Sequence, residues 1–118
     1  MNSELDRLAY GVLFPALGRP KLPNWVGPRI EAGLGGFVIF GKDIVDGDQF
    51  QRLAAELHGL RDHVLLSIDE EGGDVTRLEN HGGFSMPGNR ALGELDDLEL
   101  TRQAAFQIGL SLVEAGID

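Results

Sequence analysis

The chain has 118 residues, of which 42% are apolar, and this is enough for one globular domain with a modest core. Its 19 acidic and 10 basic side chains give a net charge of -9, which disfavours binding to nucleic acid or to an anionic membrane surface. The cysteine count is 0, so disulfides and thiolate chemistry are excluded.

The amino-terminal segment predicts a short helix followed by a strand. Ser3 is typical of a helix N-cap, and the acidic residues after it favour a helix that ends near Ala9. The apolar run over residues 11–14 predicts a first buried strand. The polar start lacks the layout of a signal peptide, and no apolar run is long enough to cross a bilayer. If Met1 is the native start, we expect a cytoplasmic protein.

The next elements are a helix over residues 25–32, capped by Asn24, and a strand over residues 36–40. The strand is apolar without alternation, which is typical of a strand buried on both faces of a parallel sheet. Trp25 is expected to pack against the body of the domain. Lys42 follows the strand, and we expect it to be a solvated cation at the rim of a site.

A third strand is predicted over residues 65–69, between two longer helices. Apolar residues at helical spacing favour a helix over 49–59, in which Asp48 and Gln51 resemble a capping box. After a long connection, a second helix is expected over 96–115. Repeated strand–helix units predict an α/β fold with a parallel sheet and right-handed crossovers.

The third strand runs directly into an acidic, glycine-rich turn. Ligands of parallel sheets bind at the carboxyl ends of the strands, so Asp69 is expected where a substrate would be held. Gly72 and Gly73 allow a sharp turn and close approach of a ligand to the backbone. Arg77 is placed to neutralise a carboxylate or to clamp a polar ligand group. On chemistry alone, acids that only cap the next helix or face water are an equal alternative.

This turn resembles the signature after the third strand of family 3 glycoside hydrolases. The run Ile-Asp-Glu-Glu-Gly-Gly over 68–73, followed by Val75 and Arg77, is most similar to the bacterial β-N-acetylglucosaminidase (β-N-acetylhexosaminidase) branch. The usual form there is Asp-Gln-Glu-Gly-Gly-Arg-Val-x-Arg. Two positions depart from it: Glu70 replaces the usual Gln and Asp74 the usual Arg, and both changes make the site more acidic.

A second block supports the resemblance. Residues 35–44, Gly-Gly-Phe-Val-Ile-Phe-Gly-Lys-Asp-Ile, resemble the second strand and following loop of the same family. The resemblance extends from about Tyr10 to Asp118. It implies the N-terminal part, about three of eight units, of a (β/α)8 TIM barrel, which in full needs about 250 residues. Residues 1–118 are then a partial barrel domain, truncated before the catalytic residues.

The resemblance implies a retaining hydrolase of β-linked N-acetylglucosaminides, such as cell-wall or chitin fragments. Asp69 matches the family aspartate that accepts hydrogen bonds from hydroxyls of the non-reducing sugar, and Arg77 matches the arginine that also reaches the substrate. Glu71, Gly72 and Gly73 shape the turn, with Glu71 expected to orient Arg77. We assign no catalytic residue, metal ligand or cofactor to this chain, because the family's catalytic residues are expected beyond its end.

Two other functions stay open. In a metal-dependent phosphoryl-transfer enzyme, Asp69 and Glu71 would hold Mg²⁺, with His81 as a further ligand. That function lacks a phosphate cradle, because Gly72 and Gly73 are followed by acids and not by Lys and Ser or Thr. The third function is a non-catalytic sugar-binding or assembly module. Three strands cannot close a barrel, so we also expect self-association through an open sheet edge.

Overall fold

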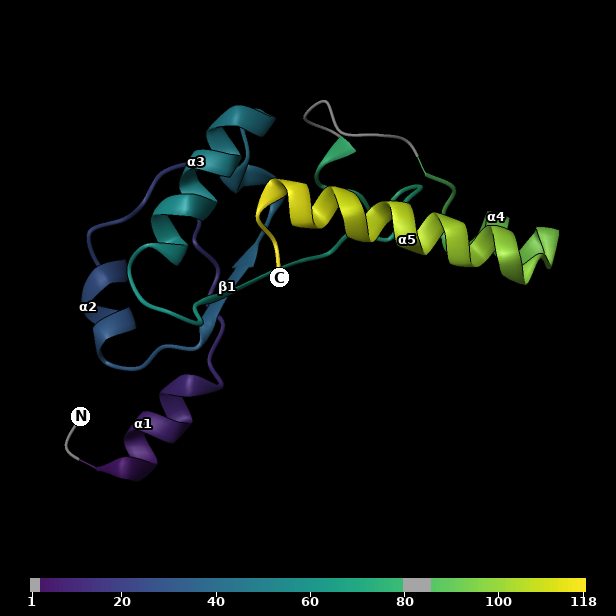
Figure 1. Cartoon of the computed structure of the whole chain (residues 1–118). Helices are drawn as coiled ribbons and strands as arrows, with labels where there is room; N and C mark the ends of the chain where they lie inside the picture. Colours follow the sequence, from purple (N-terminus) through teal and green to yellow (C-terminus); the bar gives the residue numbers. More distant parts are fainter. Residues whose placement is uncertain (1–2, 80–85) are drawn as a thin grey trace.

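The computed structural model describes residues 3–79 and 86–118 (Figure 1). The long connection predicted from residue 81 therefore lies partly outside the described residues, and His81 lies wholly outside them. Along the chain the elements are α1 (Glu4–Gly11), α2 (Val26–Glu31), β1 (Gly36–Ile39), the 3-10 turn η1 (Gly41–Asp43), α3 (Gly47–His58), β2 (Leu65–Ile68), α4 (Asn89–Leu95) and α5 (Leu98–Ala115).

β1 and β2 form a parallel pair, in which Gly36 lies opposite Leu65 and Ile39 opposite Ile68. A single parallel bridge between Ala16 and Val38 places a third segment on the other side of β1. The strands therefore end at a common edge, and α3 makes the connection between them (Figure 1). This arrangement confirms the predicted α/β fold with parallel strand–helix repeats.

The first predicted strand, over residues 11–14, is wrong. α1 continues to Gly11, and the backbone N–H of Leu13 donates to the Tyr10 carbonyl at 3.1 Å, which closes the helix end. Pairing with β1 starts only at Pro15, whose carbonyl accepts from the Val38 N–H at 3.1 Å. An apolar run alone does not distinguish a helix end from a strand, and Val12 is in fact 76% exposed.

Several helix ends also differ from those predicted. Asp46 caps α3 in place of Asp48, because its Oδ1 accepts from the Gln49 N–H at 2.7 Å. The N-cap position of α2 is Trp25 and not Asn24, and no side chain bonds to that helix end. α4 was not predicted. The left-handed backbone of Asp96 separates it from α5.

The core lies between the parallel pair and the helices that cover it. Gly36, Phe37 and Ile39 of β1 are buried and Val38 is half-buried, so the strand is largely covered on both faces, as the unbroken apolar pattern predicted. The Trp25 ring lies 5.9 Å from the Phe37 ring, so it packs against the body as expected. None of the helices in the described ranges combines the length and apolarity needed to cross a membrane. The largest fully buried apolar side chains are Phe37, Phe50, Ile30, Ile39, Leu57, Leu66, Val26 and Val64.

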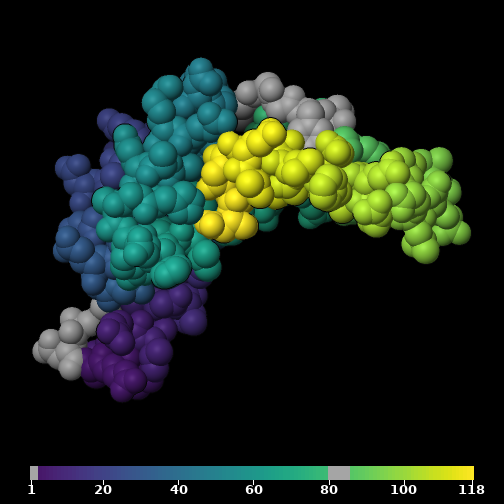
Figure 2. Space-filling view, in the orientation of Figure 1, coloured from purple at the N-terminus to yellow at the C-terminus, as the bar shows by residue number. Residues whose placement is uncertain are grey.

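The carboxyl end of α5 returns to the sheet. Gln51 Nε2 on α3 donates to the Glu114 carbonyl at 3.0 Å. The Asp118 N–H donates to the Leu66 carbonyl at 3.1 Å, and Asp118 Oδ2 accepts from the Leu66 N–H at 2.8 Å. α4 and the amino-terminal half of α5 project away from the body, which gives the molecule its length of 53 Å (Figure 2).

Candidate functional site

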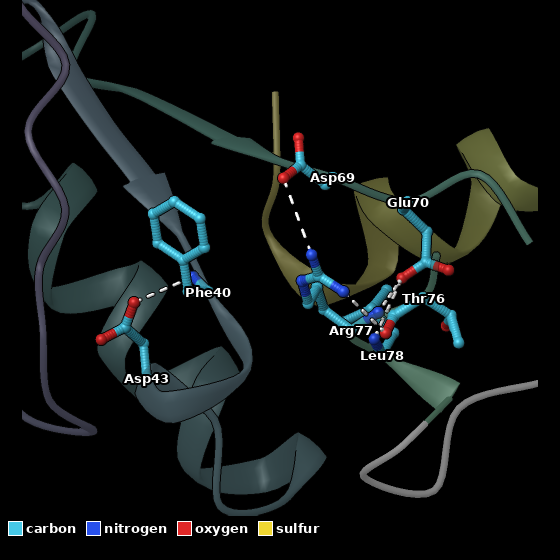
Figure 3. A network of polar contacts seen from close by, with 7 residues as sticks. All are labelled: Phe40, Asp43, Asp69, Glu70, Thr76, Arg77 and Leu78. Carbon is cyan, nitrogen blue, oxygen red and sulfur yellow. Dashed lines mark hydrogen bonds and ion pairs between the residues drawn. The ribbon is translucent and has the colours of Figure 1, made fainter. Parts of the chain in front are cut away.

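Asp69 and Arg77 meet at the edge where the parallel strands end. Asp69 directly follows β2, and Arg77 Nη2 lies 3.7 Å from Asp69 Oδ2 (Figure 3). The Asp69 side chain is 57% exposed and that of Arg77 is 27% exposed, so both face solvent from this edge. The prediction that Arg77 neutralises a carboxylate is confirmed, and that carboxylate belongs to Asp69.

Glu70 secures the backbone that carries Arg77. Its Oε2 accepts from the N–H groups of Arg77 at 2.7 Å and Leu78 at 3.0 Å (Figure 3). An ionised carboxylate that accepts two backbone N–H groups makes strong, charge-assisted hydrogen bonds. The sequence singled out Glu70 only as a departure from a motif, because no local spacing rule joins residues seven and eight positions apart.

The expected link between Glu71 and Arg77 is wrong. Glu71 Oε2 accepts from Asn89 Nδ2 at 3.1 Å, at the start of α4. Glu71 therefore ties the turn to the segment that follows the long connection, while Asp69 and Glu70 hold Arg77 by its side chain and its backbone. The error arose because the choice among three adjacent carboxylates depends on side-chain direction, which alternation alone does not fix in a turn.

Gly72 and Gly73 form the predicted sharp turn, with φ values of 74° and 56°. The Glu71 N–H donates to the Val75 carbonyl at 2.8 Å, which closes the turn. A Cβ atom at Gly72 would lie 2.8 Å from the Pro87 carbonyl oxygen. The segment at Met86 and Pro87 therefore approaches this backbone closely, and the approach of a ligand to it stays a prediction.

Across the edge, the end of β1 is held by Asp43, which the sequence did not single out. Asp43 is fully buried, and its Oδ2 accepts from the Phe40 N–H at 2.9 Å (Figure 3). Its Oδ1 has no hydrogen-bond partner within the described part of the chain. Gln49 Nε2 on α3 donates to the Asp43 carbonyl at 3.2 Å. The turn after β1 is therefore fixed from both sides.

A shallow, open cleft lies beside the end of β1. It has a volume of about 480 Å³ and is lined by Phe40, Gly41, Lys42 and Arg77. The Lys42 side chain is exposed at its rim, as expected. Arg77 therefore contacts both the cleft and Asp69.

The exposed carboxylate and guanidinium at this edge can bind a ligand through hydrogen bonds. A carboxylate such as Asp69 accepts several hydrogen bonds at once, and a guanidinium donates several in a fixed plane. The pair therefore suits a ligand that offers neighbouring hydroxyl groups. Across residues 3–79 and 86–118, no three His, Asp or Glu side chains converge as metal ligands would.

We expect Glu70→Ala to lower the free energy of unfolding by about 2 kcal/mol, because two backbone N–H groups lose their acceptor. Glu70→Gln keeps an acceptor oxygen and should lower it by less than half as much. Urea unfolding followed by circular dichroism measures both variants. Equal stability of the alanine variant and the parent would show that water replaces the carboxylate without loss.

The chain is similar to curated proteins named beta-hexosaminidase. It is 35% identical over 92 residues to that of Aromatoleum aromaticum, which covers 72% of this chain and 26% of the relative. It is 34% identical over 91 residues to that of Hydrogenovibrio crunogenus, which covers 70% of this chain and 25% of the relative. The chain thus spans about a quarter of the length of these relatives. No protein-family model matches it.

Solved structures give the same result for the fold. A glycoside hydrolase family 3 beta-N-acetylglucosaminidase from Paenibacillus sp. superposes with a TM-score of 0.88 at 34% identity, over 98% of this chain and 23% of the other. Native NagZ from Neisseria gonorrhoeae superposes with a TM-score of 0.75 at 23% identity, over 90% and 33% of the two chains, and supports the fold alone. The resemblance to family 3 glycoside hydrolases of the β-N-acetylglucosaminidase type is therefore confirmed.

Proposed function

We propose that the chain is the amino-terminal part of a β-N-acetylglucosaminidase barrel and supplies substrate-binding residues to its site. The observation that carries this proposal is the Asp69–Arg77 pair, exposed at the carboxyl edge of the parallel strands. The relatives named beta-hexosaminidase and the superposed beta-N-acetylglucosaminidase support the choice of sugar.

In this proposal Asp69 accepts hydrogen bonds from neighbouring hydroxyls of the non-reducing sugar, and Arg77 donates to the same ring. Glu70 and the turn at Gly72 and Gly73 keep the two side chains at their separation. Retaining hydrolysis also needs a nucleophile and an acid/base that flank an oxocarbenium-like transition state. We assign neither role to this chain, so the reaction itself is proposed for a longer polypeptide.

Titration of the ¹⁵N-labelled chain with methyl β-N-acetylglucosaminide tests the binding step. We expect saturable shifts of the amide signals of Asp69, Arg77 and their neighbours. Addition of the same buffer without any glycoside should give no comparable shift. Shifts that scatter over the surface, or none at all, would contradict the proposal.

A longer polypeptide with this region is expected to hydrolyse an aryl β-N-acetylglucosaminide equally fast with and without excess EDTA. The reason is that the reaction needs only protein carboxyl and imidazole groups. Initial rates measured by release of the aryl alcohol check this expectation. Hydrolysis that chelation removes and Mg²⁺ restores would contradict the metal-independent mechanism. Absence of hydrolysis together with Mg²⁺-dependent cleavage of an aryl phosphate would favour the phosphoryl-transfer alternative.

We further propose that the isolated chain self-associates through α5. Phe106, Leu110 and Val113 lie at helical spacing on one face of this helix, and Phe106 and Val113 are 58% and 71% exposed. We expect analytical ultracentrifugation to give a mass above the 12.8 kDa of one chain, and Phe106→Glu to restore the monomer. Gln107→Glu, which adds the same charge beside that face, should not. A monomeric parent chain would contradict the proposal.

A further inference from the structure

The cleft beside Asp69 is lined by two basic residues and by no acidic one. Its lining residues are Phe40, Gly41, Lys42 and Arg77, in a chain with 19 acidic and 10 basic side chains. Two cationic side chains therefore line this cleft in a chain with a net charge of -9, and Asp69 partly balances one of them, that of Arg77. Such a cleft favours a negatively charged group.

Lys42 has a fixed backbone and an uncommitted side chain. Its backbone belongs to η1, where Asp43 Oδ2 accepts from the Phe40 N–H at 2.9 Å and the Ile44 N–H donates to the Gly41 carbonyl at 3.2 Å. Its Nζ lies 6.0 Å from the centre of the Phe40 ring. In the described part of the chain, Lys42 makes no ion pair. The ammonium group is therefore available to a ligand.

Arg77 forms the opposite wall of the cleft. Its side-chain contacts with Asp69 and Thr76 are long, 3.7 Å from Nη2 to Asp69 Oδ2 and 3.4 Å from Nη1 to the Thr76 carbonyl. A Cβ atom at Gly41 would lie 3.8 Å from Arg77 Cδ, so the glycine brings the two walls close together. A group in the cleft would thus meet Lys42 and Arg77 at once.

The neighbouring acids are directed to other partners. Glu70 accepts from two backbone N–H groups, and Glu71 accepts from Asn89. Asp69 faces Arg77 and not Lys42. Hydroxyl groups of a ligand would therefore bind at Asp69, and a charged group would bind in the cleft.

We propose that this cleft is a subsite for a carboxylate carried by the sugar ligand, and that Lys42 determines the preference for an acidic over a neutral sugar. The proposal rests on the proposed function, because it takes the same edge as the sugar site. The carboxylate would accept hydrogen bonds from Lys42 Nζ and from the Arg77 guanidinium, with both contacts weakened by salt.

Calorimetric titration with a matched pair of sugars tests the proposal. The probes are methyl β-N-acetylglucosaminide and the same glycoside oxidised at C6 to a carboxylate. We expect the acid to bind about fivefold more tightly at low salt, the scale of a solvent-exposed ion pair. Lys42→Met should weaken this preference, because only the Arg77 guanidinium then remains to bind the carboxylate. Lys21→Met, which removes an exposed charge from the loop before α2, should keep the preference.

The outcomes separate this inference from the proposed function. Equal affinity of the parent chain for both sugars, or a preference that is undiminished in Lys42→Met, would overturn the inference alone. Competition by sodium sulfate as strong as that by the sugar acid would also overturn it, because the cleft would then be a general anion patch. Binding of the acid without any binding of the neutral sugar would count against the proposed function. Binding of neither sugar would overturn both.

Discussion

Asp69→Ala is expected to weaken binding of methyl β-N-acetylglucosaminide by about 100-fold, or roughly 3 kcal/mol, because two hydrogen bonds to a charged acceptor are lost. In a longer, active polypeptide the same change should lower kcat/KM for an aryl β-N-acetylglucosaminide to a similar degree. The exposed position of Asp69 predicts little effect on folding, so the loss should appear in binding and not in thermal stability.

Asp62→Ala is the matched control for this variant. Asp62 is also exposed and lies before β2, at the opposite end of the same strand. The Asp62→Ala variant loses the same charge as Asp69→Ala, but at the end of β2 away from the ligand. Its affinity for the glycoside should therefore match that of the parent chain. Equal binding by Asp69→Ala and the parent would remove Asp69 from the site.

Gly72→Ala is expected to lower the free energy of unfolding by about 3 kcal/mol, measured by urea unfolding. The left-handed backbone at φ 74° disfavours any side chain. In addition, the new Cβ would lie 2.8 Å from the Pro87 carbonyl oxygen and 2.9 Å from that of Met86. Backbone atoms cannot rotate away as a side chain does, so the turn or the segment after the long connection must shift.

Gly93→Ala provides the comparison, because Gly93 lies inside α4 with open space around it and no left-handed backbone. Here alanine is expected to raise the free energy of unfolding by up to about 1 kcal/mol through its helix propensity. If both glycine variants changed stability alike, the close contact at Gly72 would carry no energetic weight.

The sequence predicted the parts of the fold that depend on local pattern. The unbroken apolar run of β1 and the abrupt change from β2 into acids and glycines located the strands and their ligand edge. Asp69 could be placed because it directly follows a strand, and the carboxyl ends of parallel strands share an edge. The positive φ values of Gly72 and Gly73 were likewise expected from their residue type.

The parts that were missed depend on contacts between distant residues. Glu70 holds the backbone of Arg77 and Leu78, and no periodicity links such positions. The sequence gives no sign that Asp43, an acidic residue in a polar loop, is buried. In the structure it is fully buried, and it accepts a hydrogen bond from the Phe40 N–H at the end of β1. The apolar run over residues 11–14 lies at the end of α1, and pairing with β1 starts only where the Pro15 carbonyl accepts from the Val38 N–H.

The two hydrogen bonds that Glu70 accepts affect how a ligand would bind at this edge. They fix the backbone of Arg77 before any sugar arrives, and the Asp69 carboxylate lies 3.7 Å from its guanidinium. Little conformational entropy then remains to be lost on association, so even a few contacts with a small hydroxylated ring can yield measurable affinity. This edge therefore binds a ligand as a preorganised site, with little rearrangement of the protein on binding.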